Sequence, residues 1–308
     1  MSRRRKSLFV QRSEYALYRA VAAVARRLSD RGVQRWGARL GGLARRVLRS
    51  RDRLAMRNLR ATFPQMGEAE RRRILNACWQ HFGRETLTTI RMQNLPIEEI
   101  AASCPFVNAH LLEQAIGRGR GVILISAHYG GWEVGGLALM SLVKNVRTIT
   151  RPLDNQFLER DLARIRSRTG AEVLDRKRAA REMMQALSDN AVVVLLPDQA
   201  VLPREGVRVP FLGRAAWTTP VPAKMALRRS SAIVFAFCIP HETGHRLEFE
   251  NPIRVDQLSA AESDPVVLTE RINDVIARRI TDHPELWLWM HDRWKGTATG
   301  ESEGVNGE

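Results

Sequence analysis

Short, continuous apolar runs that alternate with helical patterns constrain the fold of this chain most strongly. Such runs occupy residues 121–127, 192–196 and 232–238. Each is the length of one strand and lacks polar alternation, which is typical of strands buried on both faces of a sheet. Because helical segments separate them, the pattern predicts an α/β fold with a mostly parallel central sheet, flanking helices and right-handed crossovers.

Weaker patterns complete the predicted order of elements. Residues 146–150 and 172–174 indicate two more strands, and the alternation in residues 246–250 indicates an edge strand. Helical periodicity predicts helices over residues 132–143, 155–169, 178–188, 219–229 and 265–281. In parallel sheets, active sites lie at the carboxyl ends of the strands, so polar residues at those ends are the candidates for chemistry.

The N-terminal fifth of the chain carries nearly all of its net charge. Residues 1–60 contain 18 basic and 3 acidic residues, whereas residues 61–308 contain 31 basic and 30 acidic residues. Residues 14–48 have helical apolar spacing, with a break near Gly32, and arginines border an apolar stripe that includes Leu17, Trp36 and Leu40. A basic amphipathic region of this kind favours an anionic membrane surface. Packing against the body, with solvated arginines, remains an alternative; binding of nucleic acid is disfavoured because the body is neutral.

We therefore expect a basic amphipathic membrane-associating helical region at residues 1–60, a catalytic domain at 61–295 and a disordered tail at 296–308. Residues 51–94 look helical, with an interruption at Phe63-Pro64. No apolar stretch approaches the ~20 residues of a membrane span, and the N-terminus lacks the apolar region of a cleavable signal peptide. Three dispersed cysteines suit a reducing compartment, and no spacing indicates a metal site or a cofactor.

One pair of residues at a strand end fits acid–base chemistry. His128 follows the run at 121–127 in a turn with Gly130 and Gly131, and Glu133 begins the next predicted helix. Across such a junction the carboxylate can hold one imidazole nitrogen and leave the other free as a general base. No serine or cysteine has the spacing of a nucleophile elbow, so the bound acceptor would itself be the nucleophile. The alternative is an ordinary loop histidine beside a carboxylate that suits a helix start.

Two further polar residues follow neighbouring strands. Arg151 comes after residues 146–150 and can hold a phosphate or carboxylate through its planar fork, or stabilise an oxyanion. Asp198 comes after residues 192–196 and can orient Arg151 or bind an acceptor hydroxyl. A surface arginine and a turn-forming aspartate are the alternatives.

These residues stand in blocks that resemble the bacterial lipid A biosynthesis acyltransferases, the late lauroyl and myristoyl transferases, within the wider glycerolipid acyltransferase group. The signature of that group is a histidine followed, five residues later, by aspartate or glutamate, as in His128 and Glu133. Residues 126–133 look like the family's His-Phe-Gly-Asn-Trp-Glu block. Further matching blocks follow in the family's order: residues 57–59 with 63–64, 151–155, 196–199, 209–213 and 284–295. The resemblance covers roughly residues 15–295.

The resemblance implies an O-acyltransferase that moves a fatty acyl chain from acyl carrier protein, or acyl-CoA, to a hydroxyl of a lipid A precursor or a related glycolipid. It implies His128 as the catalytic base with Glu133 as its partner, and substrate-binding roles for Arg151, Asp198, Gly130 and Gly131. The implied location is the cytoplasmic face of the bacterial inner membrane, with peripheral or monotopic attachment. Two alternatives stay open: another acceptor, such as a mannosylated inositol lipid, and a catalytically inactive assembly partner.

Three positions depart from the family pattern. Gly131 replaces a common asparagine, and Asp292 stands where a basic residue is usual. The N-terminal region is dotted with arginines where a clean apolar anchor is expected. We expect the first departure to affect the pocket, the second to affect contact with donor or acceptor, and the third to favour peripheral attachment.

Overall fold

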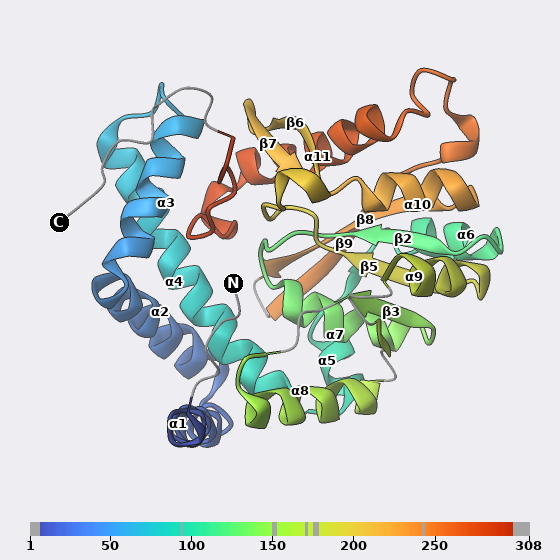
Figure 1. Ribbon diagram of the computed structural model, residues 1–308. Helices are drawn as coiled ribbons and strands as arrows, with labels where there is room; N and C mark the ends of the chain where they lie inside the picture. Colours follow the sequence, from blue (N-terminus) through green and yellow to red (C-terminus); the bar gives the residue numbers. More distant parts are fainter. Residues whose placement is uncertain are drawn as a thin grey trace.

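A seven-stranded mixed sheet forms the centre of the protein in a computed structural model that describes residues 7–93, 95–149, 153–169, 172–174, 179–241 and 244–297 (Figure 1). Its strand order is β1-β9-β8-β2-β5-β3-β4. The strands are β1 (Phe106–Val107), β2 (Val122–Ile125), β3 (Val146–Ile149), β4 (Glu172–Leu174), β5 (Val192–Leu195), β8 (Ala232–His241) and β9 (Gly244–Ile253). The strands β8, β2, β5, β3 and β4 run parallel, so the predicted α/β fold is confirmed.

The central strand β2 shows why the continuous apolar runs matter. It pairs with β8 on one side and β5 on the other, and all four of its residues are buried. Ile123 and Ile125 belong to one apolar cluster, whereas Val122 and Leu124 belong to the cluster on the opposite face. A strand covered on both faces needs an apolar side chain at every position.

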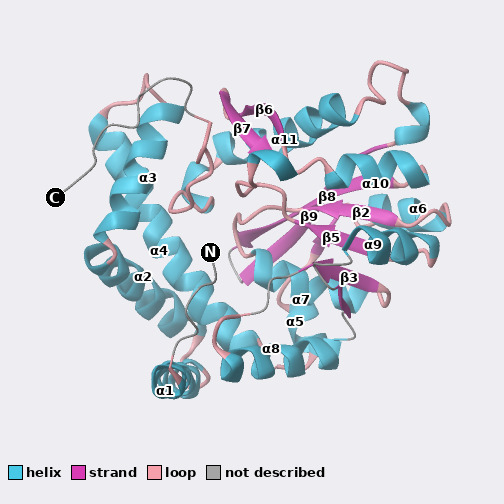
Figure 2. Cartoon of the chain, viewed as in Figure 1, coloured by secondary structure: helices cyan, strands magenta, loops and turns pink. Residues whose placement is uncertain are grey.

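Helices cover both faces of the sheet (Figure 2). The cluster containing Val122 and Leu124 also includes residues of α5 (Ile97–Ala102), α6 (His110–Gly117) and α7 (Trp132–Leu142). The opposite cluster includes residues of α9 (Ala179–Ser188), α10 (Val221–Arg229) and α11 (Pro265–Asp282). The helix α8 (Gln156–Thr169) lies at the lower edge in Figure 1, beside α1, where Tyr15 Oη donates to Asp161 Oδ2 at 3.0 Å.

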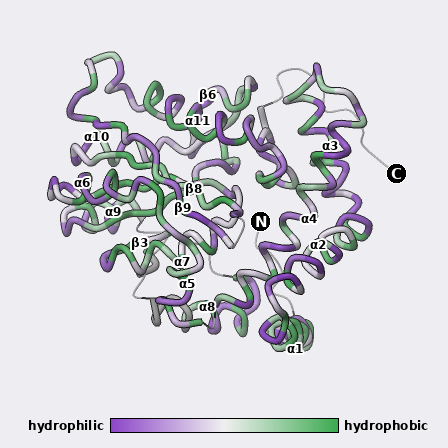
Figure 3. The backbone as a smooth tube through the Cα atoms, turned by 180° about the vertical axis from the view of Figure 1, so that it is seen from behind, coloured by the Kyte–Doolittle hydropathy of each residue, from purple (hydrophilic) through white to green (hydrophobic). Residues whose placement is uncertain are grey.

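Four N-terminal helices form a layer beside the sheet: α1 (Leu8–Ala25), α2 (Asp30–Val47), α3 (Arg49–Thr62) and α4 (Glu68–Met92). Hydrophilic and hydrophobic stretches alternate along α1, α2 and α3 (Figure 3). The helices α2 and α4 touch through glycines. A Cβ on Gly37 would lie 2.5 Å from Arg84 Cα, and a Cβ on Gly41 or Gly83 would collide with the backbone of the other helix. Only glycine permits this approach.

Some elements differ from the sequence prediction. The predicted edge strand 246–250 is the middle of β9, which pairs antiparallel with β8 and parallel with the two-residue β1. An unpredicted hairpin of β6 (Val207–Phe211) and β7 (Arg214–Thr218) packs near α11. Its strands include Pro210 and arginines, which weaken a strand pattern. Residues 298–308, most of the predicted disordered tail, lie outside the described residues.

Candidate active site

His128 lies in the β2–α7 loop (residues 126–131), at the carboxyl end of the central strand. The helix α7 begins at Trp132, whose ring centroid is 5.5 Å from that of His128. The His128 side chain is 23% exposed, so the imidazole is largely enclosed but retains contact with the outside. The sequence prediction placed this histidine at a strand end, and the structure does so as well.

Asp198 is the hydrogen-bonding partner of His128. It follows β5, the strand beside β2, and its carboxylate Oδ1 lies 2.9 Å from His128 Nδ1. Its Oδ2 accepts from the backbone N–H of His128 at 3.0 Å and from Trp287 Nε1 at 2.9 Å. Asp198 is 0% exposed and both of its oxygens are engaged. In this structure it therefore orients His128, and its predicted contact with substrate stays a prediction.

Glu133 lies near His128 but does not hold it. It is exposed in the first turn of α7 and, within the described residues, forms no hydrogen bond with His128. Its charge acts on the imidazole only through space. The expected pairing through Glu133 thus differs from the observed one, because the sequence spacing did not specify which of two strand-end carboxylates reaches Nδ1.

Electrostatics couple His128 and Asp198. Burial alone would lower the pKa of His128, but attraction to Asp198, their hydrogen bond and the charge of Glu133 outweigh it and raise the pKa above its usual value. Burial would raise the pKa of Asp198, yet His128 and the donors Trp287 Nε1 and His128 N–H keep it lowered. Asp198 therefore stays ionised and Nδ1 of a neutral His128 carries the ring proton, which leaves Nε2 as the basic nitrogen.

A C-terminal stretch, the closing segment (residues 284–294), fixes the β2–α7 loop from one side. Gly130 N–H donates to Leu286 O at 2.9 Å, and Leu288 N–H donates to His128 O at 3.1 Å. Trp287, which binds Asp198, is 1% exposed and packs edge-on against Trp289 with ring centroids 4.8 Å apart. The sequence marked this segment as a family block and predicted a contact with donor or acceptor at Asp292, but it did not predict the contact of Trp287 with Asp198. Its signal was the density of tryptophan in one short stretch.

The two glycines of the loop allow close contact with the neighbouring strands. Gly130 has φ +58°, and a Cβ there would collide with Cys238 O of β8. Gly131 N–H donates to the same carbonyl at 2.9 Å. A Cβ on Gly131 would lie 2.5 Å from His245 Cδ2 and 2.8 Å from Glu85 Oε2. Packing alone thus requires glycine at both positions; their predicted substrate-binding role stays a prediction.

A second imidazole–carboxylate pair lies behind the loop. His245 Nε2 of β9 is 2.8 Å from Glu85 Oε2 of α4, and both side chains are buried. Burial would lower the pKa of His245, but the hydrogen bond and charge of Glu85 raise it. Residues 85 and 245 are 160 positions apart, so no local sequence pattern could have indicated this pair.

A buried arginine stabilises the far end of the closing segment. Arg293 is 0% exposed and donates to Trp217 O at 2.7 Å and to Thr218 Oγ1 at 2.5 Å, which ties the segment to β7. Burial lowers the pKa of Arg293 to about 10.

The predicted ligand-binding Arg151 lies outside the described residues.

The arrangement can perform general-base chemistry. An ionised, buried carboxylate orients a partly exposed imidazole, as in enzymes that deprotonate a hydroxyl. The family model described as bacterial lipid A biosynthesis acyltransferase matches residues 2–296, with His128 and Asp198 both inside the match. The chain belongs to this family. It is an acyltransferase of the lipid A or glycolipid type.

This family member is similar to several characterised acyltransferases at low sequence identity, but over most of its length. The chain is 26% identical to the lipid A biosynthesis lauroyltransferase of Escherichia coli K12 over 87% of both chains. It is 23% identical to the phosphatidylinositol mannoside acyltransferase of Mycolicibacterium smegmatis over 74% of both chains. Among solved structures, the 1-acyl-sn-glycerophosphate acyltransferase PlsC of Thermotoga maritima matches 75% of this chain and 97% of its own, with 14% identity and a TM-score of 0.37, too weak a likeness to add to the fold described above.

Proposed function

We propose that this acyltransferase moves a fatty acyl chain from the thioester of acyl carrier protein, or of acyl-CoA, to a hydroxyl of a lipid A precursor or a related glycolipid. The observation that carries the proposal is the oriented, partly exposed His128 beside buried Asp198 in a chain of this family. An imidazole oriented in this way serves a reaction in which a hydroxyl must lose its proton.

In the proposed reaction, His128 Nε2 takes the proton from the acceptor hydroxyl as its oxygen attacks the thioester carbonyl. The resulting tetrahedral intermediate expels the thiolate, which recovers the proton from His128, and the products are the ester and the free thiol. Asp198 keeps the second nitrogen protonated and stabilises the imidazolium that forms. Glu133, exposed beside the ring, adds a weaker, solvent-screened attraction.

The start of α7 is the proposed site for the negative charge on the intermediate. The helix has no side-chain cap, and its first intrahelical bond runs from Gly135 N–H to Gly131 O. Within the described chain, the N–H groups of Trp132, Glu133 and Val134 have no acceptor. Free N–H groups at a helix N-terminus, adjoining the base, suit a developing oxyanion. Arg151, Gly130 and Gly131 remain proposed contacts to substrate on the basis of the sequence.

We also propose that α1 and α2 contact the anionic surface of the inner membrane. Large apolar side chains are exposed along these helices: Leu17 (67%), Val24 (59%), Trp36 (50%), Leu40 (43%), Leu43 (55%) and Val47 (70%). Arginines lie among them, and Arg39 lies over the Trp36 ring at 4.8 Å. Exposed apolar residues bordered by arginines suit the boundary between lipid head groups and acyl chains. No helix in the described part of the chain is both long enough and apolar enough to cross a bilayer.

Mass spectrometry of lipids tests the function directly. Cells that lack the gene should accumulate an acceptor that is lighter by one fatty acyl group, and the wild-type gene should restore the mass. A His128→Ala gene should leave the defect uncorrected while the variant protein remains folded and present. A corrected defect with His128→Ala would exclude the proposed chemistry and favour the inactive assembly partner.

An inositol-mannoside acceptor is the second candidate. It is favoured by the similarity to relatives named phosphatidylinositol mannoside acyltransferases, which match 74% of the chain in one case. The same lipid comparison separates the two candidates, because the missing acyl group would then lie on a mannosylated inositol lipid and not on lipid A.

A further inference from the structure

A groove lined by arginines lies between α3 and the start of α4. It has a volume of about 660 Å³, and its basic lining consists of Arg45, Arg53, Arg57, Arg60 and Arg72. We call it the α3 groove. Arg57, Arg60 and Arg72 have side chains 69%, 56% and 63% exposed, so their guanidinium groups are accessible from outside.

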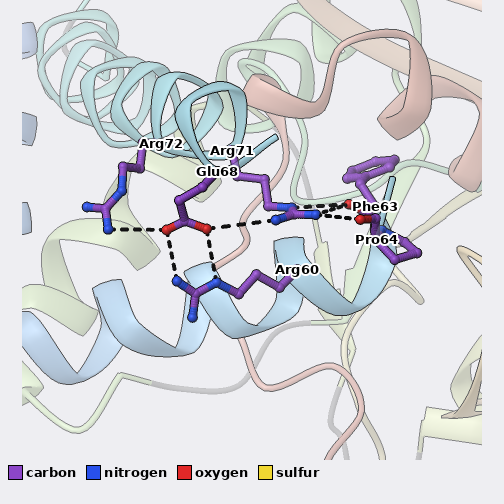
Figure 4. A network of polar contacts seen from close by, with 6 residues as sticks. All are labelled: Arg60, Phe63, Pro64, Glu68, Arg71 and Arg72. Atoms are coloured by element: carbon purple, nitrogen blue, oxygen red, sulfur yellow. Dashed lines mark hydrogen bonds and ion pairs between the residues drawn. The ribbon is translucent and has the colours of Figure 1, made fainter. Parts of the chain in front are cut away.

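The neighbouring carboxylates are too few to neutralise this groove. Its five arginines face three carboxylates: Asp52, which pairs with Arg45 at 2.9 Å, Asp292, which lies 3.4 Å from Arg57, and Glu68. Glu68 is shared, with Arg60 at 2.8 Å and Arg72 at 3.2 Å, and it lies 3.8 Å from Arg71 (Figure 4). Arg53 is exposed and forms no ion pair within the described residues. Because one carboxylate serves several guanidinium groups, the groove keeps a positive excess.

The α3 groove differs from the α1–α2 face in one property that indicates its partner. The exposed large apolar residues of the described N-terminal helices lie on α1, on α2 and at Leu48, and α3 contributes none. A bilayer favours insertion of large exposed apolar side chains beside basic residues, whereas the apolar residues that line the α3 groove are the buried Met56 and the small Ala61. Concave, guanidinium-rich surfaces without apolar anchors fit carboxylates, which arginine binds through two parallel hydrogen bonds.

The helix α3, which lines the groove, also contacts the closing segment beside the candidate active site. Asn58 of α3 donates to Trp289 O and His291 O at 3.0 Å each, and Arg57 lies 3.4 Å from Asp292 Oδ1. These three partners belong to the closing segment, whose Trp287 binds Asp198. A partner in the α3 groove would thus contact Arg57, which also pairs with the segment that supports His128.

We propose that the α3 groove docks the acidic surface of the carrier protein that presents the acyl thioester. The inference rests on the proposed function, because it supplies the docking place for one of the two donors named there. Charge complementarity in such contacts mainly speeds the encounter of the two proteins and sets their orientation. Removal of the arginines should therefore lower activity at low salt, and only with the protein donor.

The test compares Arg53→Gln/Arg57→Gln with the matched control Arg181→Gln/Arg228→Gln. The control removes two exposed arginines from α9 and α10, on the other side of the molecule from α3 (Figure 1). Three donors carry the same acyl chain: the carrier protein, CoA and uncharged N-acetylcysteamine. For the α3 variant we expect kcat/KM with the carrier-protein donor to fall about tenfold at low salt, and less at 0.5 M salt. Losses with the other donors and in the control should be less than about twofold.

Each other outcome overturns the proposal. Equal loss with carrier protein and CoA would make the groove a site for donor phosphates. Unchanged kinetics, together with weaker binding to vesicles of phosphatidylglycerol and phosphatidylcholine (1:3), would make it a lipid contact. Loss with all three donors would indicate damage to the active site.

Direct binding separates this proposal from the proposed function. The Kd of fluorescently labelled carrier protein, measured by anisotropy, should rise about tenfold in the α3 variant, and charge reversal of carrier-protein glutamates should reproduce the effect in wild type. If the wild-type enzyme uses no donor but binds the carrier protein through the α3 groove, the proposed function fails and the docking surface stands. If acyl transfer proceeds without such binding, the docking surface fails alone.

Discussion

Replacement of Asp198 by asparagine tests the core of the proposed mechanism. Asparagine has nearly the same shape, and its single carbonyl oxygen can still accept from Trp287 Nε1 and the His128 N–H, which lie 2.9 and 3.0 Å from Oδ2. Its NH₂ group then faces His128 Nδ1, 2.9 Å from the present Oδ1. An amide donor turns Nδ1 into the acceptor, so the ring proton moves to Nε2, the atom that must take the hydroxyl proton. We expect kcat to fall about 10³–10⁴-fold, as when a catalytic triad adopts the wrong tautomer.

The pH profile supplies a second readout with a definite sign. The base acts only when unprotonated, so wild-type kcat/KM should decline as the pH falls through a value above the usual histidine pKa, because burial, which lowers the pKa of His128, is outweighed by Asp198 and Glu133. In Asp198→Asn the attraction to the carboxylate is gone and burial remains. The pKa of His128 should therefore fall, and the residual activity should persist to lower pH than in wild type.

Glu133→Gln is the matched control, since it removes a carboxylate near His128 without touching the bond to Asp198. Its effect should be less than about tenfold on kcat, because Glu133 is exposed and its charge is screened. Its pH profile should shift slightly in the same direction. Circular dichroism and thermal melting would verify that both variants fold. A larger loss in Glu133→Gln than in Asp198→Asn would refute the assignment of Asp198 as the partner.

Three further predictions concern the β2–α7 loop, Arg151 and membrane binding. Gly131→Ala should lower kcat/KM about 10²-fold, because a Cβ 2.5 Å from His245 Cδ2 must displace the loop by ~1 Å. The control Gly136→Ala, which has open space at its Cβ, should be neutral. Equal activities of the two variants would contradict this account. Arg151→Lys should be substantially impaired in steady-state assays because a point charge does not replace a planar fork, and full activity would return Arg151 to an ordinary surface role. In flotation assays the wild-type protein should bind anionic liposomes better than neutral ones, and 1 M salt should release only part of it. A variant with glutamine in place of five arginines should lose the preference for anionic liposomes. Equal binding of the wild type to both kinds of liposome would refute the electrostatic contribution. Those arginines are Arg19, Arg26, Arg27, Arg35 and Arg39.

The sequence predicted most of the sheet because the buried strands β2, β5 and β8 have no polar alternation. It also predicted that His128 and Asp198 both lie at strand ends. It could not predict that they are partners, since strand order, and hence the neighbourhood of β2 and β5, is set by packing across 70 residues. The five-residue spacing suggested Glu133 as the partner of His128, but such a spacing carries no information on contacts with residues far away in the sequence.

The remaining misses have a similar origin. Trp287 binds Asp198 from 89 residues away, and His245 reaches Glu85 from 160 residues away. Neither contact leaves a periodic signature, because each joins single side chains that lie far apart along the chain. The hairpin β6–β7 was missed for a local reason: its partly polar strands contribute few residues to the core.

The glycine contact between α2 and α4 has a mechanical consequence. No side chain separates the two backbones at Gly37, Gly41 and Gly83, so the helices cannot slide past each other. They therefore behave as one rigid unit, the α2–α4 strut. The same α4 carries Glu85, which abuts the loop of His128 through His245. If α2 rests on lipid, the strut sets a fixed height for His128 above the bilayer. Acceptor hydroxyls would then be sorted by their depth as well as by their chemistry.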